Sequence, residues 1–175
     1  FDMPTGDRIA FAAADLPGPG RILPGTLATV LLALADHTTP VFLDRALAAE
    51  GVVGPWLAFH ARAPIAADPA EAVFAAIADP RAMPPLDAFP AGTDATPERS
   101  ATLLIALATL SDGPPLTLSG PGIDGTRALG PAPLPADFAA AWSRNAGLFP
   151  RGVDLVLAAG GRIACLPRTT RIAEA

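Results

Sequence analysis

The feature that most constrains the fold is the pair Gly160-Gly161, which lies between two apolar runs, residues 153–159 and 162–166. A two-residue Gly-Gly connection with its freedom at positive φ predicts a tight β-hairpin, because both glycines can adopt the backbone of such a turn. The turn also fixes the register of the two strands. The predicted facing pairs are Ala159 with Arg162, Leu157 with Ala164, Leu155 with Leu166, Val153 with Arg168, and Arg151 with Thr170.

This register places Arg168 on the apolar face formed by Val153, Leu155 and Leu157. A guanidinium in an apolar setting is costly unless it is paired, so Arg168 requires a carboxylate, a cluster of backbone carbonyls or a bound anion. One interpretation is structural, with Arg168 reaching the sheet edge or pairing with Asp154 or another acid. The other is a binding site for an anion. The sequence leaves both interpretations open.

The rest of the chain predicts a single α/β domain over residues 1–175. The mixture of helices with strands that are apolar on both sides favours a central mixed β-sheet covered by helices on both faces. Helices are expected at residues 7–16, at 26–36 with Thr26 as the cap, and at 135–149 with Pro135 in the first turn and Gly147 near the end; strands are expected at 40–43, 71–78, 100–110 and 115–119.

Composition excludes several function classes. The chain has 175 residues, a hydrophobic content of 51%, a net charge of -5 and a pI near 4.8, which argue against a nucleic-acid binder or a protein of anionic membrane surfaces. All 12 basic residues are Arg. Without Lys, a pyridoxal phosphate Schiff base and a Walker-type phosphate site are both excluded, so no cofactor is expected.

Residues 27–35 hold the longest apolar stretch, which is too short to cross a membrane. The single cysteine, Cys165, permits no internal disulfide, and a reducing cytoplasm is the expected compartment. His37 and His60 show no metal-ligand spacing with Cys or carboxylates, so no protein-bound metal is expected.

Further candidate residues each carry two interpretations. The motif GPGIDG at 120–125 resembles a dinucleotide loop but lacks a following helix, so Gly120 and Gly122 are expected to allow close approach of a strand or of a ligand phosphate. Arg99 and Ser100 lie at a strand entrance, either as an anion contact or as a solvated loop. His60 is interpreted as a packing histidine rather than a base. No catalytic acid-base pair or nucleophile is evident.

The ordered segments of this chain resemble the PhnH family, the H subunit of the bacterial carbon-phosphorus lyase core complex. The segments that carry the resemblance are LLALADHTTPVFLD (31–44), WLAFH (56–60), PERSATLLI (97–105), LTLSGPGI (116–123), FPRGVDLVL (149–157) and LPRTTRI (166–172). The resemblance implies a fold similar to the large domain of PLP-dependent transferases, without the PLP. It also implies a homodimer in isolation and assembly with the G, I and J subunits.

The complex of that family, with its L protein, replaces the adenine of ATP with an alkylphosphonate at ribose carbon 1, so the resemblance implies a supporting role in transfer of ribose triphosphate. Two hypotheses follow. In the first, Arg168, Thr169 and Thr170, with Arg151 and the turn at 120–122, form an accessory anion-binding corner for a phosphate or nucleotide at a subunit boundary. In the second, the chain is a pure scaffold subunit without a ligand site. The candidate residues in full are Arg168, Thr169, Thr170, Arg151, Asp154, Gly120, Gly122, Arg99, Ser100 and His60.

Overall fold

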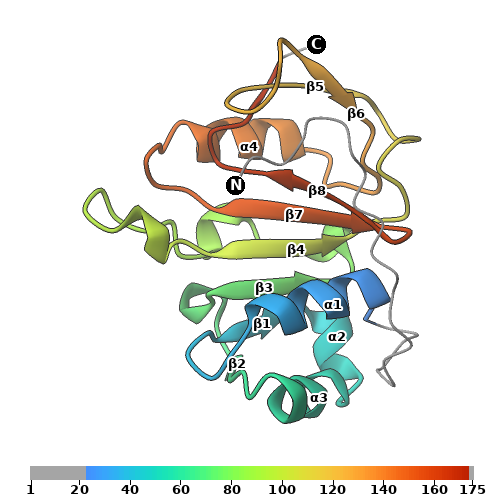
Figure 1. Ribbon diagram of the computed structural model, residues 1–175, viewed down its shortest axis with the longest axis vertical. Coiled ribbons are helices and arrows are strands. Elements are labelled where there is room, and N and C mark those ends of the chain that lie inside the picture. Colours follow the sequence, from blue (N-terminus) through green and yellow to red (C-terminus); the bar gives the residue numbers. More distant parts are fainter. Residues whose placement is uncertain (1–22, 174–175) are drawn as a thin grey trace.

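A six-stranded mixed β-sheet forms the centre of the molecule. The computed structural model describes residues 23–173. The strand order is β2-β1-β3-β4-β7-β8, and all neighbouring pairs are parallel except β7 and β8, which are antiparallel (Figure 1). The strands are β1 (Val41–Leu43), β2 (Ile65–Ala66), β3 (Phe74–Ile77), β4 (Thr102–Ala106), β7 (Asp154–Ala159) and β8 (Arg162–Leu166). The prediction of a central mixed sheet is confirmed.

Helical elements cover both faces of this sheet, as expected. Along β4, Leu103 and Ile105 belong to one buried cluster and Leu104 and Ala106 to the other, because successive strand residues point to opposite faces. The first cluster packs against α4 (Phe138–Ala146) and the turn η3 (Leu86–Ala88). The second packs against α1 (Gly25–Leu34), α2 (Arg45–Ala49) and α3 (Val53–His60). The remaining short 3₁₀ turns are η1 (Pro69–Glu71), η2 (Pro80–Ala82) and η4 (Pro97–Arg99).

A second, three-stranded antiparallel sheet lies beyond α4, in the order β6-β5-β9 (Figure 1). Its strands are β6 (Arg127–Leu129), β5 (Leu116–Ser119) and β9 (Arg171–Ile172). The predicted strand at 115–119 therefore exists, but it does not join the central sheet. Only Leu118 of β5 is buried, which is the pattern of a strand with one face on the core.

The hairpin register is confirmed from Ala159–Arg162 to Leu155–Leu166. The ladder ends there, so the predicted facing pairs of Val153 with Arg168 and of Arg151 with Thr170 are wrong. Pro167 follows the last paired residue and has no N–H to continue the ladder. The N–H of Arg168 instead donates to Asp154 Oδ1 at 2.7 Å.

Two of the predicted helices are present with different starts. The helix predicted at 26–36 is α1, but its N-cap is Pro24, and Thr26 lies buried within the helix instead of capping it. The helix predicted at 135–149 is α4, which begins only at Phe138 and, as expected, ends at Gly147. The predicted helix at 7–16 lies outside the described residues. The predicted strands at 71–78 and 100–110 are shorter, at 74–77 and 102–106.

Asp44 joins the N-terminus of α2 to the segment that leaves β3. Its side chain is buried, with the residue only 4% exposed. One carboxylate oxygen accepts from Leu47 N at 2.9 Å, which caps α2, and the other accepts from Ala78 N at 2.7 Å and Asp79 N at 2.8 Å. Asp44 therefore anchors the start of the chain segment that follows β3.

Candidate functional site

Arg168 holds the most extensive side-chain network in the described part of the chain. Nε donates to Asp154 Oδ1 at 3.1 Å, and Nη1 donates to the carbonyls of Pro97 at 2.9 Å and Pro150 at 3.2 Å. Nη2 donates to Ser100 Oγ and to Asp154 Oδ2. A guanidinium carries five N–H donors, and all five meet a protein acceptor here.

The Arg168 cluster is largely shielded from solvent. The Arg168 side chain is 14% exposed and that of Asp154 is 30% exposed, so the ion pair is partly screened from water. The acceptors come from η4, the segment between η4 and β4, the loop before β7 and β7 itself. Of the interpretations left open by the sequence, the structural one is realised: Arg168 pairs with a carboxylate and with backbone carbonyls. Binding of an anion at this corner stays a prediction.

The two threonines after Arg168 lie beside the Gly120 turn. Gly120 has φ +136°, and a Cβ at this position would stand 2.9 Å from the carbonyl oxygen of Thr169. Gly120 therefore allows the turn before β9 to approach closely, while contact with a ligand phosphate, the other alternative for this glycine, stays a prediction. Thr170 is buried, and its carbonyl accepts from Trp142 Nε1 at 2.9 Å. Gly122 has φ +84° and faces open space.

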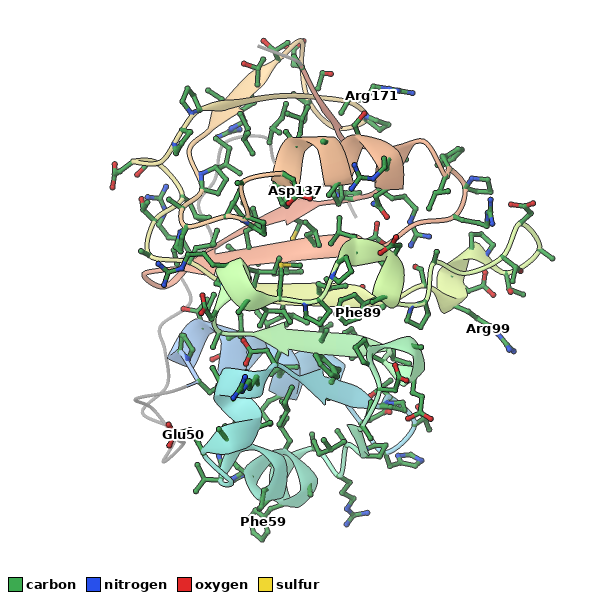
Figure 2. The ribbon with its side chains drawn as sticks, turned by 180° about the vertical axis from the view of Figure 1, so that it is seen from behind. Glu50, Phe59, Phe89, Arg99, Asp137 and Arg171 are labelled. Carbon is green, nitrogen blue, oxygen red and sulfur yellow. The ribbon has the colours of Figure 1, made fainter. Side chains whose placement is uncertain are left out.

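The other candidates make no contact with the Arg168 guanidinium. Arg151 is exposed and pairs with Asp94 at 3.2 Å. Arg99 lies exposed in η4 and points away from the body of the molecule (Figure 2). His60 ends α3, where its ring packs against those of Trp56 and Phe59, with centroids 5.1 and 4.9 Å apart. His60 is exposed and Phe59 is 81% exposed, so this contact lies at the surface, and the interpretation of His60 as a packing histidine stays a prediction.

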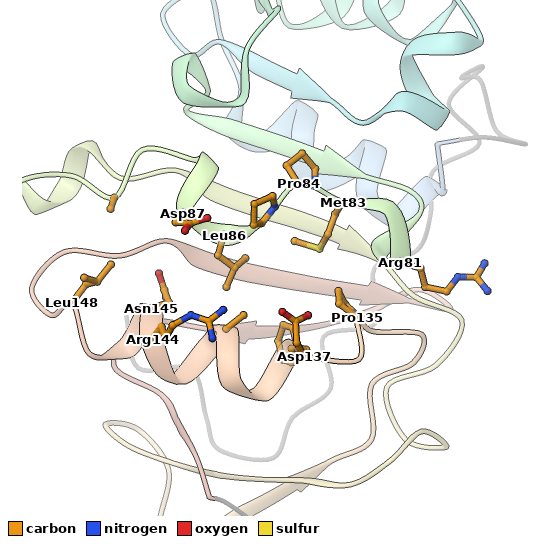
Figure 3. Close-up of a pocket in the computed structure, with 14 residues that line it drawn as sticks. Arg81, Met83, Pro84, Leu86, Asp87, Pro135, Asp137, Arg144, Asn145 and Leu148 are labelled. Carbon is orange, nitrogen blue, oxygen red and sulfur yellow. The ribbon is translucent and has the colours of Figure 1, made fainter.

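A groove that the sequence did not indicate lies between α4 and the segment 81–91. It has a volume of about 510 Å³ (Figure 3). On one side it is lined by residues of α4 and the turn before it, and on the other by the loop that follows β3. The signal present in the sequence was the spacing of Asp137, Ala141, Arg144 and Leu148, which is that of one helical face, but nothing in the sequence supplied the opposite wall.

Residues 23–173 hold neither a cluster of metal ligands nor a membrane-spanning helix. In that range no three His, Cys, Asp or Glu side chains gather as metal ligands would, and no helix has the length and apolar character needed to span a membrane. Cys165 is exposed on β8, and partial desolvation by its neighbours raises the pKa of its thiol. A raised thiol pKa is the opposite of what a reactive cysteine needs.

Comparisons with known proteins match nearly the whole chain. A family model described as bacterial phosphonate metabolism protein (PhnH) matches residues 9–173. A protein of Rhizobium meliloti (strain 1021), named alpha-D-ribose 1-methylphosphonate 5-triphosphate synthase subunit PhnH, is 40% identical over 165 residues, covering 94% of this chain and 80% of that protein. A putative C-P lyase subunit protein HtxG of Stutzerimonas stutzeri is 37% identical over 81 residues, covering 46% of this chain and 42% of that protein.

Proposed function

This chain belongs to the PhnH family of bacterial phosphonate metabolism proteins, and from that premise we propose that it is an assembly subunit of a carbon-phosphorus lyase core complex. The observation that carries the proposal is the 40% identity, over 94% of the chain, to a protein named as a synthase subunit. The family model spans residues 9–173, a range that includes every described strand, both helical layers and Arg168.

The reaction supported by this subunit is the transfer of ribose triphosphate from ATP to an alkylphosphonate, with release of adenine. The name of the Rhizobium relative gives a product with a phosphonate at ribose position 1 and a triphosphate at position 5. That product differs from ATP by exchange of the base for the phosphonate. The proposed role is to support this exchange within the complex.

The described residues favour a supporting role over autonomous catalysis. Ser100 Oγ accepts from Arg168 and has no adjacent base, and His60 lies against aromatic rings. General acid-base chemistry needs a titratable group within hydrogen-bond reach of a nucleophile or substrate. The Ser and Thr hydroxyls that do hydrogen-bond a carboxylate are Thr38 and Thr39 with Asp36, and Thr109 and Ser111 with Asp112. These exposed pairs lie outside the Arg168 network and do not line the groove beside α4.

The remaining expectations from the family resemblance belong to the same proposal. They are a homodimer in isolation, assembly with the G, I and J subunits, a cytoplasmic location, and a likeness to the large domain of PLP-dependent transferases without the cofactor. Two facts support the last: the absence of Lys removes the residue that PLP would need, and the sheet is of the mixed type with both faces covered. An accessory phosphate or nucleotide site at the Arg168 corner also remains proposed. It would require Arg168 to exchange a protein acceptor for a ligand oxygen.

The experiment is a genetic and biochemical test in a bacterium that lacks its own H subunit. We expect this chain to restore growth on methylphosphonate as sole phosphorus source and to co-purify with the G, I and J subunits. Arg168→Ala should weaken both, while Arg99→Ala, an exposed arginine outside the network, should leave both intact. Failure of the unaltered chain to restore growth or to join the complex, with the protein present at normal level, contradicts the proposal.

A further inference from the structure

The groove between α4 and the loop after β3 has the dimensions of a site for a small molecule. Its volume of about 510 Å³ lies within the range of about 300–1,000 Å³ that such sites occupy. It is bounded on one side by α4 and on the other by η2, η3 and the segment between them (Figure 3).

The lining of the groove suits a flat, apolar group. Leu86 and Phe138 are 8% and 4% exposed and belong to the core, so they form a rigid floor. Three prolines, Pro84, Pro85 and Pro135, contribute ring faces to the walls. Proline rings and an aromatic side chain lose little conformational freedom when a planar ring packs on them. This part of the groove therefore favours an aromatic heterocycle over a flexible chain.

Three charged side chains of the groove are unpaired among the described residues. Asp87, Asp137 and Arg144 make no hydrogen bond or ion pair with another side chain of residues 23–173. Asn145, by contrast, is engaged with the N–H and the carbonyl of Val153, at 2.8 and 2.9 Å. Arg81 also lines the groove, but it pairs with Asp79 at 3.3 Å. Asp87, Asp137 and Arg144 are thus the charged groups of the groove that have no partner among the described residues.

The three charged side chains divide between the two ends of the groove. Asp137 and Arg144 project from α4 into the groove, and Asp87 lies on the opposite wall, nearer to Arg144 than to the end at Asp137 (Figure 3). The helical rise of about 1.5 Å per residue separates Asp137 from Arg144 by about 10 Å along α4. The end at Arg144 and Asp87 therefore offers a hydrogen-bond donor and an acceptor together, and the end at Asp137 offers an acceptor.

We propose that this groove binds a purine nucleoside moiety. The Watson-Crick edge of a purine carries donors and acceptors side by side, which suits Asp87 and Arg144, and the ring packs on the apolar floor. The vicinal hydroxyls of the ribose donate to Asp137, since a carboxylate is the usual acceptor for a ribose diol. The choice of adenine as the base rests on the proposed function, in which ATP is the donor of the ribose.

The same charges disfavour other ligand classes. Free phosphate or phosphonate is too small to span the groove, and the lining holds two carboxylates beside its two arginines, so it offers no net positive charge to an anion. A fatty acid offers no hydrogen-bond donor to Asp87 or Asp137. A nucleoside satisfies all three charges while any 5′-phosphates extend toward solvent, so affinity is expected to come mainly from the base and ribose.

The test is titration calorimetry of the full chain with adenosine, ATP, tripolyphosphate and 2′,3′-dideoxyadenosine. Adenosine and ATP should bind with dissociation constants within a few fold of each other, and tripolyphosphate should not bind. Loss of the diol, or Asp137→Asn, should each weaken binding by roughly tenfold, as expected for hydrogen bonds to a charged group. Loss of the diol and Asp137→Asn each remove the same hydrogen bonds between the ribose and Asp137. Asp137→Asn should therefore leave the affinity for 2′,3′-dideoxyadenosine unchanged.

Two further variants supply a second test of the groove and a control outside it. Ala141→Trp should fill the groove and abolish adenosine binding, with thermal unfolding used to confirm that each variant is folded. Arg99→Gln, outside the groove, should bind adenosine as the unaltered chain does. The inference is overturned if adenosine and ATP show no binding at millimolar concentration, or if Asp137→Asn and Ala141→Trp leave the affinity unchanged. Growth on methylphosphonate is scored separately, so loss of nucleoside binding with intact complementation rejects the groove site and leaves the assembly role standing.

Discussion

Replacement of Arg168 by alanine is the sharpest test of how this fold is held together. The change removes a guanidinium that bonds the Asp154 carboxylate, two backbone carbonyls and Ser100 Oγ. Ser100 is buried, at 8% exposed, and would lose a partner that water replaces only in part. The partners left behind are therefore the main cause of the expected loss of stability.

The magnitude follows from the burial of the pair. Removal of one member of a fully buried ion pair costs about 3–5 kcal/mol. Asp154 is 30% exposed, so solvent screens part of this cost, and we expect a loss of about 2–3 kcal/mol in the free energy of unfolding. At about 2–4 °C per kcal/mol for a chain of this size, the midpoint of thermal unfolding should fall by about 4–12 °C.

Urea unfolding followed by circular dichroism measures this loss directly. Arg168→Lys should recover only part of the stability, because an ammonium cannot reproduce the planar fork that reaches four partners. Arg99→Ala is the matched control and should change stability by less than about 0.5 kcal/mol. If Arg168→Ala costs no more than Arg99→Ala, the network does not stabilise the fold and our reasoning is refuted.

Two other substitutions and one alkylation reaction test separate features of the structure. Trp142→Phe removes the buried hydrogen bond from Nε1 to the Thr170 carbonyl, and urea unfolding should show a loss of about 1–2 kcal/mol. Gly152→Ala should cost more than about 2 kcal/mol by the same measurement, because φ is +117° and the new Cβ would lie 3.0 Å from the Asn145 carbonyl oxygen. Because desolvation raises the thiol pKa of Cys165, its alkylation by iodoacetamide at pH 8 should be slower in the folded chain than in urea, and faster as pH rises.

Matched controls make these results interpretable. Trp56 Nε1 is buried without a hydrogen-bond partner in the described structure, so Trp56→Phe should cost less than Trp142→Phe. Gly122 has φ +84°, but no atom lies within 4 Å of the place that a Cβ would take, so Gly122→Ala should cost less than Gly152→Ala. Reversal of either order would show that the named contacts are not the cause. Equal alkylation rates of folded and unfolded chains would contradict the effect of desolvation.

Local signals in the sequence predicted the elements whose structure is decided locally. The Gly160-Gly161 turn sets the register of β7 and β8, because two glycines and alternating apolar residues leave one favourable pairing. The apolar stripes along α1 and α4 were likewise sufficient to predict that these two segments are helices. The second sheet was not predicted, since β5 pairs with β9 through Leu118 and Ile172, which lie far apart in sequence. Periodicity says nothing about such pairings.

At the candidate site, too, a local requirement was predicted and the contacts between distant segments were not. That Arg168 needs a negative partner followed from the cost of burying a charge, and Asp154 was among the acids considered. The carbonyls of Pro97 and Pro150 could not be predicted, because every residue carries such a group and only the folded backbone aims it. The groove was missed for a related reason. Its two walls come from separate segments, and their approach depends on how α4 packs on the sheet.

The buried carboxylate of Asp44 has a consequence for the groove on the opposite side of the sheet. It caps a helix that packs on one layer while it holds the amides of Ala78 and Asp79, from which the far wall of the groove departs. The point where that wall begins is therefore held by a residue that does not line the groove. One carboxylate thus fixes both the first turn of a helix in one layer and the origin of the groove wall in the other.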